Sequence, residues 1–209
     1  LVNLGRIMPR TLLNDAVALD IPLNSKEGFV RQIIGWREFV HHVHELTNGF
    51  ATDSTPVRAR AAAGWEGEWP AAKITPNVLE NSYELPPTFW GEKSGMLCLD
   101  TAVSDVVETG YAHHIPRLMV LANIGNLLGI HPRELTDWFW AMFTDAYDWV
   151  VEPNVLAMGT YAVGEVMTTK PYVSGTPYIK KMGDYCGDCS LHFKKSCPIS
   201  DMYWNFLEE

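Results

Sequence analysis

The spacing of four cysteines is the feature that most constrains this chain. Cys186, Cys189 and Cys197 form a C-x2-C-x7-C-P run, and Cys98 lies far upstream. Three thiolates this close together can hold one metal centre, and Cys98 is the cysteine left to complete its coordination. A proline directly after the last cysteine is typical of bacterial [4Fe–4S] proteins. The spacing therefore predicts a metal centre bound by Cys98, Cys186, Cys189 and Cys197.

Other interpretations of the cysteines stay open. A tetrahedral zinc ion also accepts four thiolates, and His192 lies where it could replace one of them. Free cysteines and disulfides are less favoured, because a Cys186–Cys189 bridge would be strained and no secretory signal is visible. Since an oxidising compartment would destroy a thiolate cluster, we expect a cytoplasmic protein.

Length and charge bound the class of protein. The 209 residues suffice for one large domain with a sizeable core. No apolar stretch approaches the roughly 18 residues of a membrane span, so we expect no membrane partner. The net charge of −9 argues against a broad nucleic-acid-binding face. Five lysines near the cysteine run form either a solvated face or a local binding site for backbone phosphates: Lys170, Lys180, Lys181, Lys194 and Lys195.

Apolar residues recur at helical spacing before the middle of the chain. The stripe Phe29, Ile33, Trp36 and Val40 predicts a helix, with a cap at Asn24 or Ser25. Periodicity is lost over residues 51–87, which are rich in proline and alanine, so we expect an irregular surface excursion there.

Helical spacing returns after residue 87. A helix is expected from Asp100 or Thr101, and Pro116 lies in the first turn of the next helix or kinks the previous one. Gly129 is the expected end of that second helix. A further helix begins at His131 and carries one apolar stripe: Leu135, Trp138, Met142, Ala146 and Trp149.

The pattern as a whole predicts an all-α protein. Residues 158–178 are rich in glycine, threonine and proline and should wrap around a site as loop and short helix. We expect residues 1–209 to form one helical domain, with residues 179–209 as its cluster-binding segment. Because the sequence opens without an initiator methionine and stops without a tail, we expect it to be part of a longer protein.

Four motifs, followed by the cysteine run, resemble the flavin-binding helical domain of the photolyase/cryptochrome family. The likeness is to its iron–sulfur bacterial branch of cryptochromes and (6-4) photolyases. It implies two cofactors, FAD and a [4Fe–4S] cluster. It also implies that the antenna domain, with its chromophore, and the first helices of the flavin domain are missing here. The motifs cover residues 27–39, 111–119, 145–154 and 170–179.

The resemblance implies a set of FAD-binding residues. Gln32, Trp36 and Arg37 offer an amide, a flat aromatic ring and a guanidinium, which suit the isoalloxazine edge and the pyrophosphate. An ordinary core tryptophan beside a surface arginine is the alternative. Arg117 and Asp145 would form a hydrogen-bonded pair at the edge of the flavin ring.

The resemblance also implies a catalytic set. Protonation of a photoproduct needs a group that titrates near neutrality, as histidine does. His114, beside His113, would face the lesion, and Tyr172 and Tyr178 would line the same site. Leu118 stands where the eukaryotic enzymes carry another histidine.

Trp138 and Trp90 match the aromatic residues of an electron-transfer relay to the flavin, although core stacking explains them equally well. Phe139 stands where a redox-active tyrosine would be and cannot lose a proton on oxidation. The position nearest the flavin N5 falls at Val151, which cannot tune flavin protonation, and the adjacent Glu152 should point elsewhere.

Three functions follow as hypotheses. The leading one is a lyase of the (6-4) photolyase type, in which light-excited reduced FAD repairs (6-4) photoproducts in UV-damaged DNA. The second is a blue-light photoreceptor, a bacterial cryptochrome without repair. The third is a helical nucleic-acid-binding module stabilised by iron–sulfur or zinc and lacking FAD, which is similar to the cluster domain of the primase large subunit.

Overall fold

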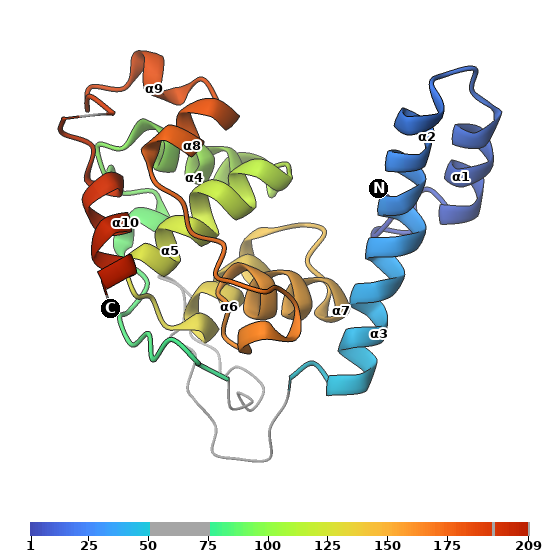
Figure 1. The fold of residues 1–209 in the computed structure, drawn as a ribbon, viewed down its shortest axis with the longest axis horizontal. Helices are drawn as coiled ribbons and strands as arrows, with labels where there is room; N and C mark the ends of the chain where they lie inside the picture. Colours follow the sequence, from blue (N-terminus) through green and yellow to red (C-terminus); the bar gives the residue numbers. More distant parts are fainter. Residues whose placement is uncertain (51–75, 194, 209) are drawn as a thin grey trace.

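The computed structural model describes residues 1–50, 76–193 and 195–208, which form helices joined by loops (Figure 1). Within these ranges the one strand-like pairing is an isolated bridge between Tyr83 and Ile130. The all-α prediction is therefore confirmed. Most of the predicted excursion over residues 51–87 lies outside the described residues, as does Lys194. None of the described helices is long and apolar enough to cross a membrane.

The elements follow one another in a simple order, with η marking 3-10 and π-helical turns. They are α1 (Pro9–Ala18), α2 (Leu23–Val30), η1 (Arg31–Trp36), α3 (Arg37–Thr47), η2 (Pro87–Trp90), α4 (Leu97–Thr109), η3 (Pro116–Ala122), α5 (Asn123–Leu127), α6 (Pro132–Met142), α7 (Asp148–Val151), η4 (Glu152–Gly159), η5 (Gly164–Val166), α8 (Thr176–Met182), α9 (Tyr185–Asp188) and α10 (Pro198–Glu208).

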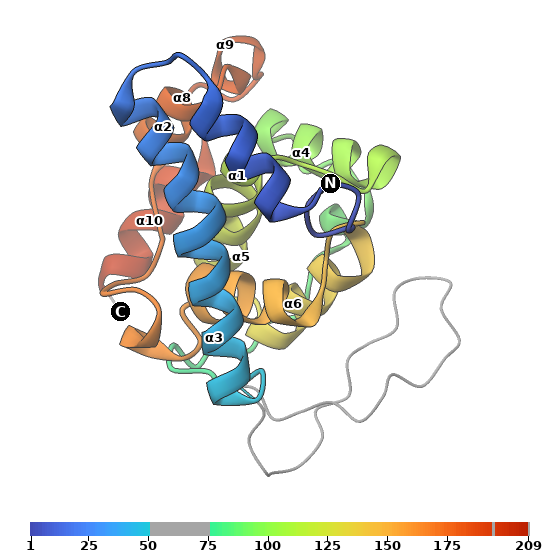
Figure 2. The same cartoon turned by 90° about the vertical axis from the view of Figure 1, so that its right-hand side faces the viewer.

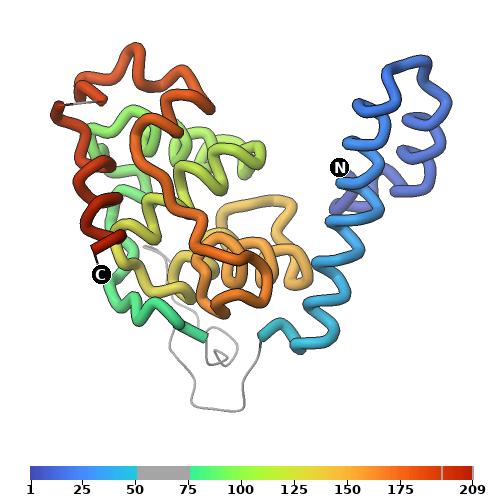
Figure 3. Tube along the Cα trace, in the orientation of Figure 1, coloured from blue at the N-terminus to red at the C-terminus, as the bar shows by residue number. Residues whose placement is uncertain are grey.

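The helices form a body and an N-terminal arm. The arm, α1 to α3, stands to one side of the body (Figures 1 and 2). It meets the body mainly where α3 packs on α7 and η4, and through Trp36 of η1, which is hydrogen-bonded to Asn154 of η4. α10 runs along the opposite edge of the body, so the chain ends far from the arm (Figure 3).

Trp138 lies at the centre of the main core and is 2% exposed. Its indole nitrogen donates a hydrogen bond of 2.9 Å to the carbonyl of Phe89, which satisfies its polar group. The rings of Phe89, Phe139 and Phe143 meet it edge-on at 5.3, 5.3 and 5.9 Å. Aliphatic side chains from α4, η3, α5 and α6 complete this core, among them Leu99, Val103, Val106, Leu121, Ile124 and Leu135.

Three helices widen into π turns along their length. η1 continues α2 into α3, η3 leads into α5, and η4 continues α7. Pro116 and Pro153 lie in the first turn of η3 and of η4. Since proline lacks an amide hydrogen and crowds the preceding turn, a wider turn accommodates it with less strain. Turns of this kind occur frequently at functional sites.

Several predicted helix boundaries are confirmed. The residues just before Pro116 are already helical, so this proline lies in a first turn. Gly129 follows the C-cap of α5 with φ +64°, and a Cβ there would meet the Tyr83 ring at 3.0 Å. α6 begins after His131, whose Nδ1 accepts a hydrogen bond from the amide of Arg133.

Other predicted boundaries are wrong. α4 begins at Leu97, before Asp100, because the Asp100 carboxylate accepts hydrogen bonds from the amide and hydroxyl of Ser94 and so closes the preceding turn. α2 begins at Leu23, and neither Asn24 nor Ser25 caps it. The Pro22 carbonyl accepts the amide of Ser25 instead.

The stripe predicted to run from Leu135 to Trp149 is also interrupted. α6 ends at Met142, where Phe143 turns to an extended backbone and the Thr144 amide bonds to Gly110. Ala146 and Trp149 therefore belong to the following turn and to α7.

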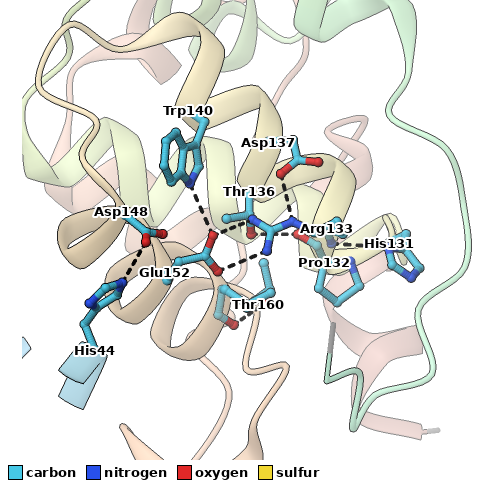
Figure 4. A network of polar contacts seen from close by, with 11 residues as sticks. His44, His131, Pro132, Arg133, Thr136, Asp137, Trp140, Asp148, Glu152 and Thr160 are labelled. Atoms are coloured by element: carbon cyan, nitrogen blue, oxygen red, sulfur yellow. Dashed lines mark hydrogen bonds and ion pairs between the residues drawn. The ribbon is translucent and has the colours of Figure 1, made fainter. Parts of the chain in front are cut away.

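A buried ion-pair network joins α6 to η4 (Figure 4). Arg133 and Glu152 are only 6% and 3% exposed, and they form a bidentate pair with N–O distances of 3.0 and 2.8 Å. Arg133 Nε also donates to Asp137 at 2.8 Å, and the indole of Trp140 donates to Glu152 at 3.3 Å. Glu152 thus points away from the open side of η4, as predicted.

A second contact joins α3 to α7. His44 Nε2 lies 2.9 Å from a carboxylate oxygen of Asp148 (Figure 4). This is the distance of an ion pair between the two side chains.

Breaking the buried pair should destabilise the fold strongly. Glu152→Ala leaves the Arg133 guanidinium buried with Asp137 as its remaining carboxylate, and such a change costs about 3–5 kcal/mol. Urea unfolding measures the loss. Glu165→Ala, at an exposed glutamate of η5, is the matched control and should stay within about 0.5 kcal/mol of the wild type. Equal stabilities for the two variants would contradict the role of the network.

The same network should give stability a defined pH dependence. Burial raises the pKa of Asp137 from 3.8 to about 6, and the Glu152 charge adds to this although Arg133 opposes it. The pKa of Asp137 is higher in the folded state than in the unfolded state, so the ionised carboxylate lowers the free energy of unfolding above pH 6. This destabilisation disappears as the pH falls toward 4, where the carboxyl is protonated in the folded protein. The stability of the wild type minus that of Asp137→Asn should therefore fall by up to about 3 kcal/mol as pH rises from 4 to 7. A difference independent of pH would contradict this.

Candidate functional site

A cleft of about 370 Å³ lies between the arm and the body. η1 and α3 form one wall, and η3, the α6–α7 turn and η4 form the other. All five residues predicted to bind FAD line it: Gln32, Trp36, Arg37, Arg117 and Asp145. The volume is within the range of small-molecule sites. The three π-helical segments all contribute to its walls.

Arg117 and Asp145 meet in the cleft as a bidentate pair, with N–O distances of 2.9 and 3.1 Å. Arg117 Nε also donates to the carbonyl of Ala112 at 2.6 Å. Its guanidinium carbon lies 4.2 Å from the centre of the Phe143 ring and 5.2 Å from that of Tyr111. Fixed in this way, the pair presents a rigid polar edge to a ligand.

The opposite wall holds Trp36 and Arg37. The Trp36 indole donates to the Oδ1 atom of Asn154 at 2.9 Å, which ties η1 to η4 across the cleft. Arg37 lies over the ring of Trp149 at 4.7 Å, and its Nε is buried without a hydrogen-bond partner. A buried donor of this kind is costly to leave unpaired, so it is suited to an anionic ligand such as a phosphate. Gln32 lies on the exposed rim.

His113 and His114 stand at the mouth of the cleft. His113 Nδ1 accepts a hydrogen bond from the amide of Ile115 at 3.3 Å, which fixes its ring. Partial burial lowers the pKa of His114, and the charges of Arg117 and His113 lower it further. The His114 imidazole is therefore mainly neutral at pH 7 in the free protein.

The two predicted tyrosines lie elsewhere. Tyr172 and Tyr178 line a second cavity of about 820 Å³, together with Lys170. This cavity adjoins the cleft, since Trp36 and Met158 line both. The histidines do not line the second cavity, so the four predicted catalytic residues occupy two neighbouring sites instead of one.

The loop that carries Tyr172 is held by a buried amide. Asn123 donates to the carbonyl of Ser174 at 3.0 Å and accepts from its amide at 2.8 Å. This side chain replaces a backbone partner, so the loop over the second cavity keeps one conformation without a strand beside it.

The four cysteines line one small enclosed cavity, although Cys98 comes from α4 and the other three from around α9 and before α10. Burial, aided by the charges of the other three thiols, raises the pKa of Cys98 to about 12. Burial also raises the pKa of Cys186 and of Cys197. Four thiols gathered where their thiolates repel one another are suited to a cation that compensates the charge.

The spacing of the sulfurs bears on which metal would fit. Zinc–sulfur bonds of about 2.3 Å place the sulfurs of a tetrahedral zinc site about 3.8 Å apart. All four cysteines are described, and no three of their sulfurs lie within 4.8 Å of one another. His192 is exposed and does not line the cavity. Both observations suit a larger inorganic core better than a single zinc ion.

The predicted relay tryptophans lie behind the cleft. Trp138 does not line it but touches Phe139 and Phe143, which do. Trp90 is partly buried against the same core. Val151 is buried in the cleft wall.

Three of the cleft residues that were not predicted as site residues contact predicted ones. Asn154 pairs with Trp36, Tyr111 lies beside Arg117, and Trp149 lies under Arg37. Tyr111 begins one of the four sequence motifs and Asn154 ends another. The motifs therefore include these residues, but the sequence does not reveal which residues they contact.

No family model matches this sequence. The chain is 37% identical over 191 residues to a protein named (6-4) photolyase from Agrobacterium fabrum, which is 89% of this chain and 33% of that relative. It is also 37% identical over 89 residues to an uncharacterised protein, R855, of Acanthamoeba polyphaga mimivirus, which is 43% of this chain and 62% of that protein. The chain spans about a third of the length of the photolyase. With nearly nine-tenths of its sequence aligned and an all-helical fold, the chain belongs to the photolyase family.

Proposed function

We propose that this protein binds FAD in the cleft and a [4Fe–4S] cluster on its four cysteines, and that it acts in light-driven repair of (6-4) photoproducts in DNA. The observation that carries the proposal is the meeting of Gln32, Trp36, Arg37, Arg117 and Asp145 around one cavity. The name of the bacterial relative supports the reaction, since that protein is a (6-4) photolyase.

The cleft offers complementary groups for each part of FAD. The free Nε of Arg37 suits the pyrophosphate, and the Arg117–Asp145 pair offers both donor and acceptor atoms to the polar edge of a flavin ring. Trp36 and Trp149 supply flat apolar surface in the same walls. When bound and reduced, FAD supplies the electron that light drives to the lesion.

The second cavity is the candidate position for the flipped lesion. A base must leave the stack before an enzyme can act on it, and aromatic side chains then hold it. Tyr172, Tyr178 and the 63%-exposed Trp204 provide such surfaces, and Lys170 offers a positive charge to a backbone phosphate. Because Trp36 lines both cavities, the lesion and the cofactor would lie on either side of one residue.

His114 is the candidate proton donor. It lines the cleft and not the second cavity, so the lesion would have to reach across the boundary between the two cavities to meet it. Its lowered pKa leaves it neutral at pH 7 in the free protein, and the negative charge of bound DNA would raise that pKa again. His114 would thus become protonated, and able to donate a proton, mainly when DNA is bound.

A blue-light photoreceptor is the second candidate function. The net charge of −9 and the lowered pKa of His114 favour it, because both weigh against DNA binding and proton donation by the free protein. A nucleic-acid-binding module without FAD is the least favoured, since it would have no use for the polar groups gathered in the cleft.

The cysteine centre is proposed to act mainly as a structural staple. It would tie α4 to the segment around α9 and α10, so its assembly and folding would be coupled. Cys98→Ala should abolish the broad brown absorbance and bound iron of the purified protein and sharply lower its yield. Val103→Ala, which deletes buried volume from the same helix, should keep both iron and the flavin bands. Zinc in a colourless wild-type protein, or full iron in Cys98→Ala, would contradict the assignment.

His114→Ala separates the two candidate functions. Repair of a (6-4) lesion in an oligonucleotide should fall by about 10²–10⁴-fold, the usual contribution of a general acid, whereas flavin photoreduction should stay unchanged. Repair by the wild type should also become faster as pH falls from 8 to 6, since more His114 is then protonated. Undetectable repair by the wild type with intact photoreduction would favour the photoreceptor, and equal repair by wild type and variant would remove His114 from the mechanism.

A further inference from the structure

Three side chains of α3 converge at one point. Successive residues of an α-helix are rotated by about 100°, so Glu45 lies one turn beyond His41 and His42 and between them in angle. Each of the three offers one donor atom, and these atoms all lie within 4.8 Å of one another. Among the described residues this is the one group of three or more histidine, cysteine or acidic residues with that property.

The two distances from Glu45 are close to those between metal ligands. Glu45 Oε2 lies 3.8 Å from His41 Nδ1 and 3.6 Å from His42 Nδ1. Both separations are too long for hydrogen bonds, which end near 3.2 Å. A tetrahedral zinc ion with bonds of about 2.1 Å holds neighbouring ligand atoms about 3.4 Å apart. The Glu45 oxygen therefore needs to move by only a few tenths of an ångström toward each histidine, and the two imidazole nitrogens already lie within 4.8 Å of each other.

We propose that His41, His42 and Glu45 form a surface site for a divalent transition metal, with Zn²⁺ as the expected ion. Two imidazole nitrogens and one carboxylate suit zinc, nickel or copper, whereas magnesium and calcium prefer oxygen ligands alone. The side chains are 41%, 67% and 60% exposed, so water can complete the coordination shell.

The neighbouring charged groups on α3 leave the site to these three ligands. The carboxylate of Glu38 contacts Arg37 at 3.2 Å, and His44 points across to Asp148 on α7. The site is also separate from the cysteine cavity, none of whose lining residues comes from α3. The proposal does not depend on flavin binding or on DNA repair.

The site touches the wall of the cleft through one ring. His41 meets Trp149 edge-on, with ring centres 5.6 Å apart, and Trp149 lines the cleft under Arg37. A metal on His41 therefore lies next to an indole, where nickel or copper quenches fluorescence. Metal binding would also fix the ring that packs against this wall.

Equilibrium dialysis against ZnCl₂ tests the proposal, with His42→Ala and Glu45→Gln as variants. Because the cysteines can also take up zinc, the measured quantity is the difference in zinc bound per chain. We expect the wild type to bind one more zinc ion than either variant. Asp15→Asn removes the same charge from an exposed position on α1 and should bind as the wild type does. Equal zinc content in all four proteins would overturn the site.

A second readout locates the ion. NiCl₂ should quench part of the tryptophan fluorescence of the wild type, and this part should be lost in His42→Ala and in Trp149→Phe. Circular dichroism without metal checks that each variant is folded, which is expected because the ligands lie on the surface of one helix. Quenching that persists in both variants would place the nickel elsewhere and contradict the proposal.

Discussion

The buried pair of Arg133 and Glu152 is the interaction on which the cleft depends. It fixes α6 against the start of η4, and the continuous helix of α7 and η4 then carries Val151 and Asn154 into the cleft wall. Asn154 in turn holds Trp36 on the arm. A charge pair this well buried contributes less to net stability than to fixing one arrangement of helices, because desolvation offsets most of its attraction. Here the arrangement it fixes is that of the cleft.

The cysteine cavity and the second cavity share a support. The buried Thr176 hydroxyl donates to the carbonyl of Phe193 at 3.0 Å and lies 2.5 Å from the hydroxyl of Ser200, so one residue of α8 joins the cysteine segment to α10. Asn123 holds Ser174, which lies two residues before Thr176 in the loop that leads into α8. Loss of the cysteine centre would therefore displace Tyr172 and Tyr178, which are joined to it by a short stretch of chain. The proposed structural centre would in this way affect the second cavity.

Residue spacing predicted the helical class, the helix after His131 and the turn at Gly129, because these depend on local backbone preferences. The convergence of Cys98 with its distant partners was predicted from the spacing and number of the cysteines, and that of Arg117 with Asp145 from the family resemblance. Both needed tertiary structure to be seen. The interrupted stripe at Met142 and the start of α4 were missed. A backbone bond from Thr144 to Gly110 ends the first, and hydrogen bonds from Ser94 to the Asp100 carboxylate fix the second. The separation of the tyrosines from the histidines had no local signal at all.

The three π turns have a consequence for how this protein can change. Each holds one more residue per turn than the α-helix around it, and each borders the cleft. Deleting a single residue from η1 would let the helix relax to its ordinary pitch with little rotation of α2 against α3, because the wider turn already absorbs the extra residue. The residues inside η1 would change their places instead, and Gln32 and Trp36 are among them. The helical arm should therefore survive a one-residue deletion that its cleft wall does not.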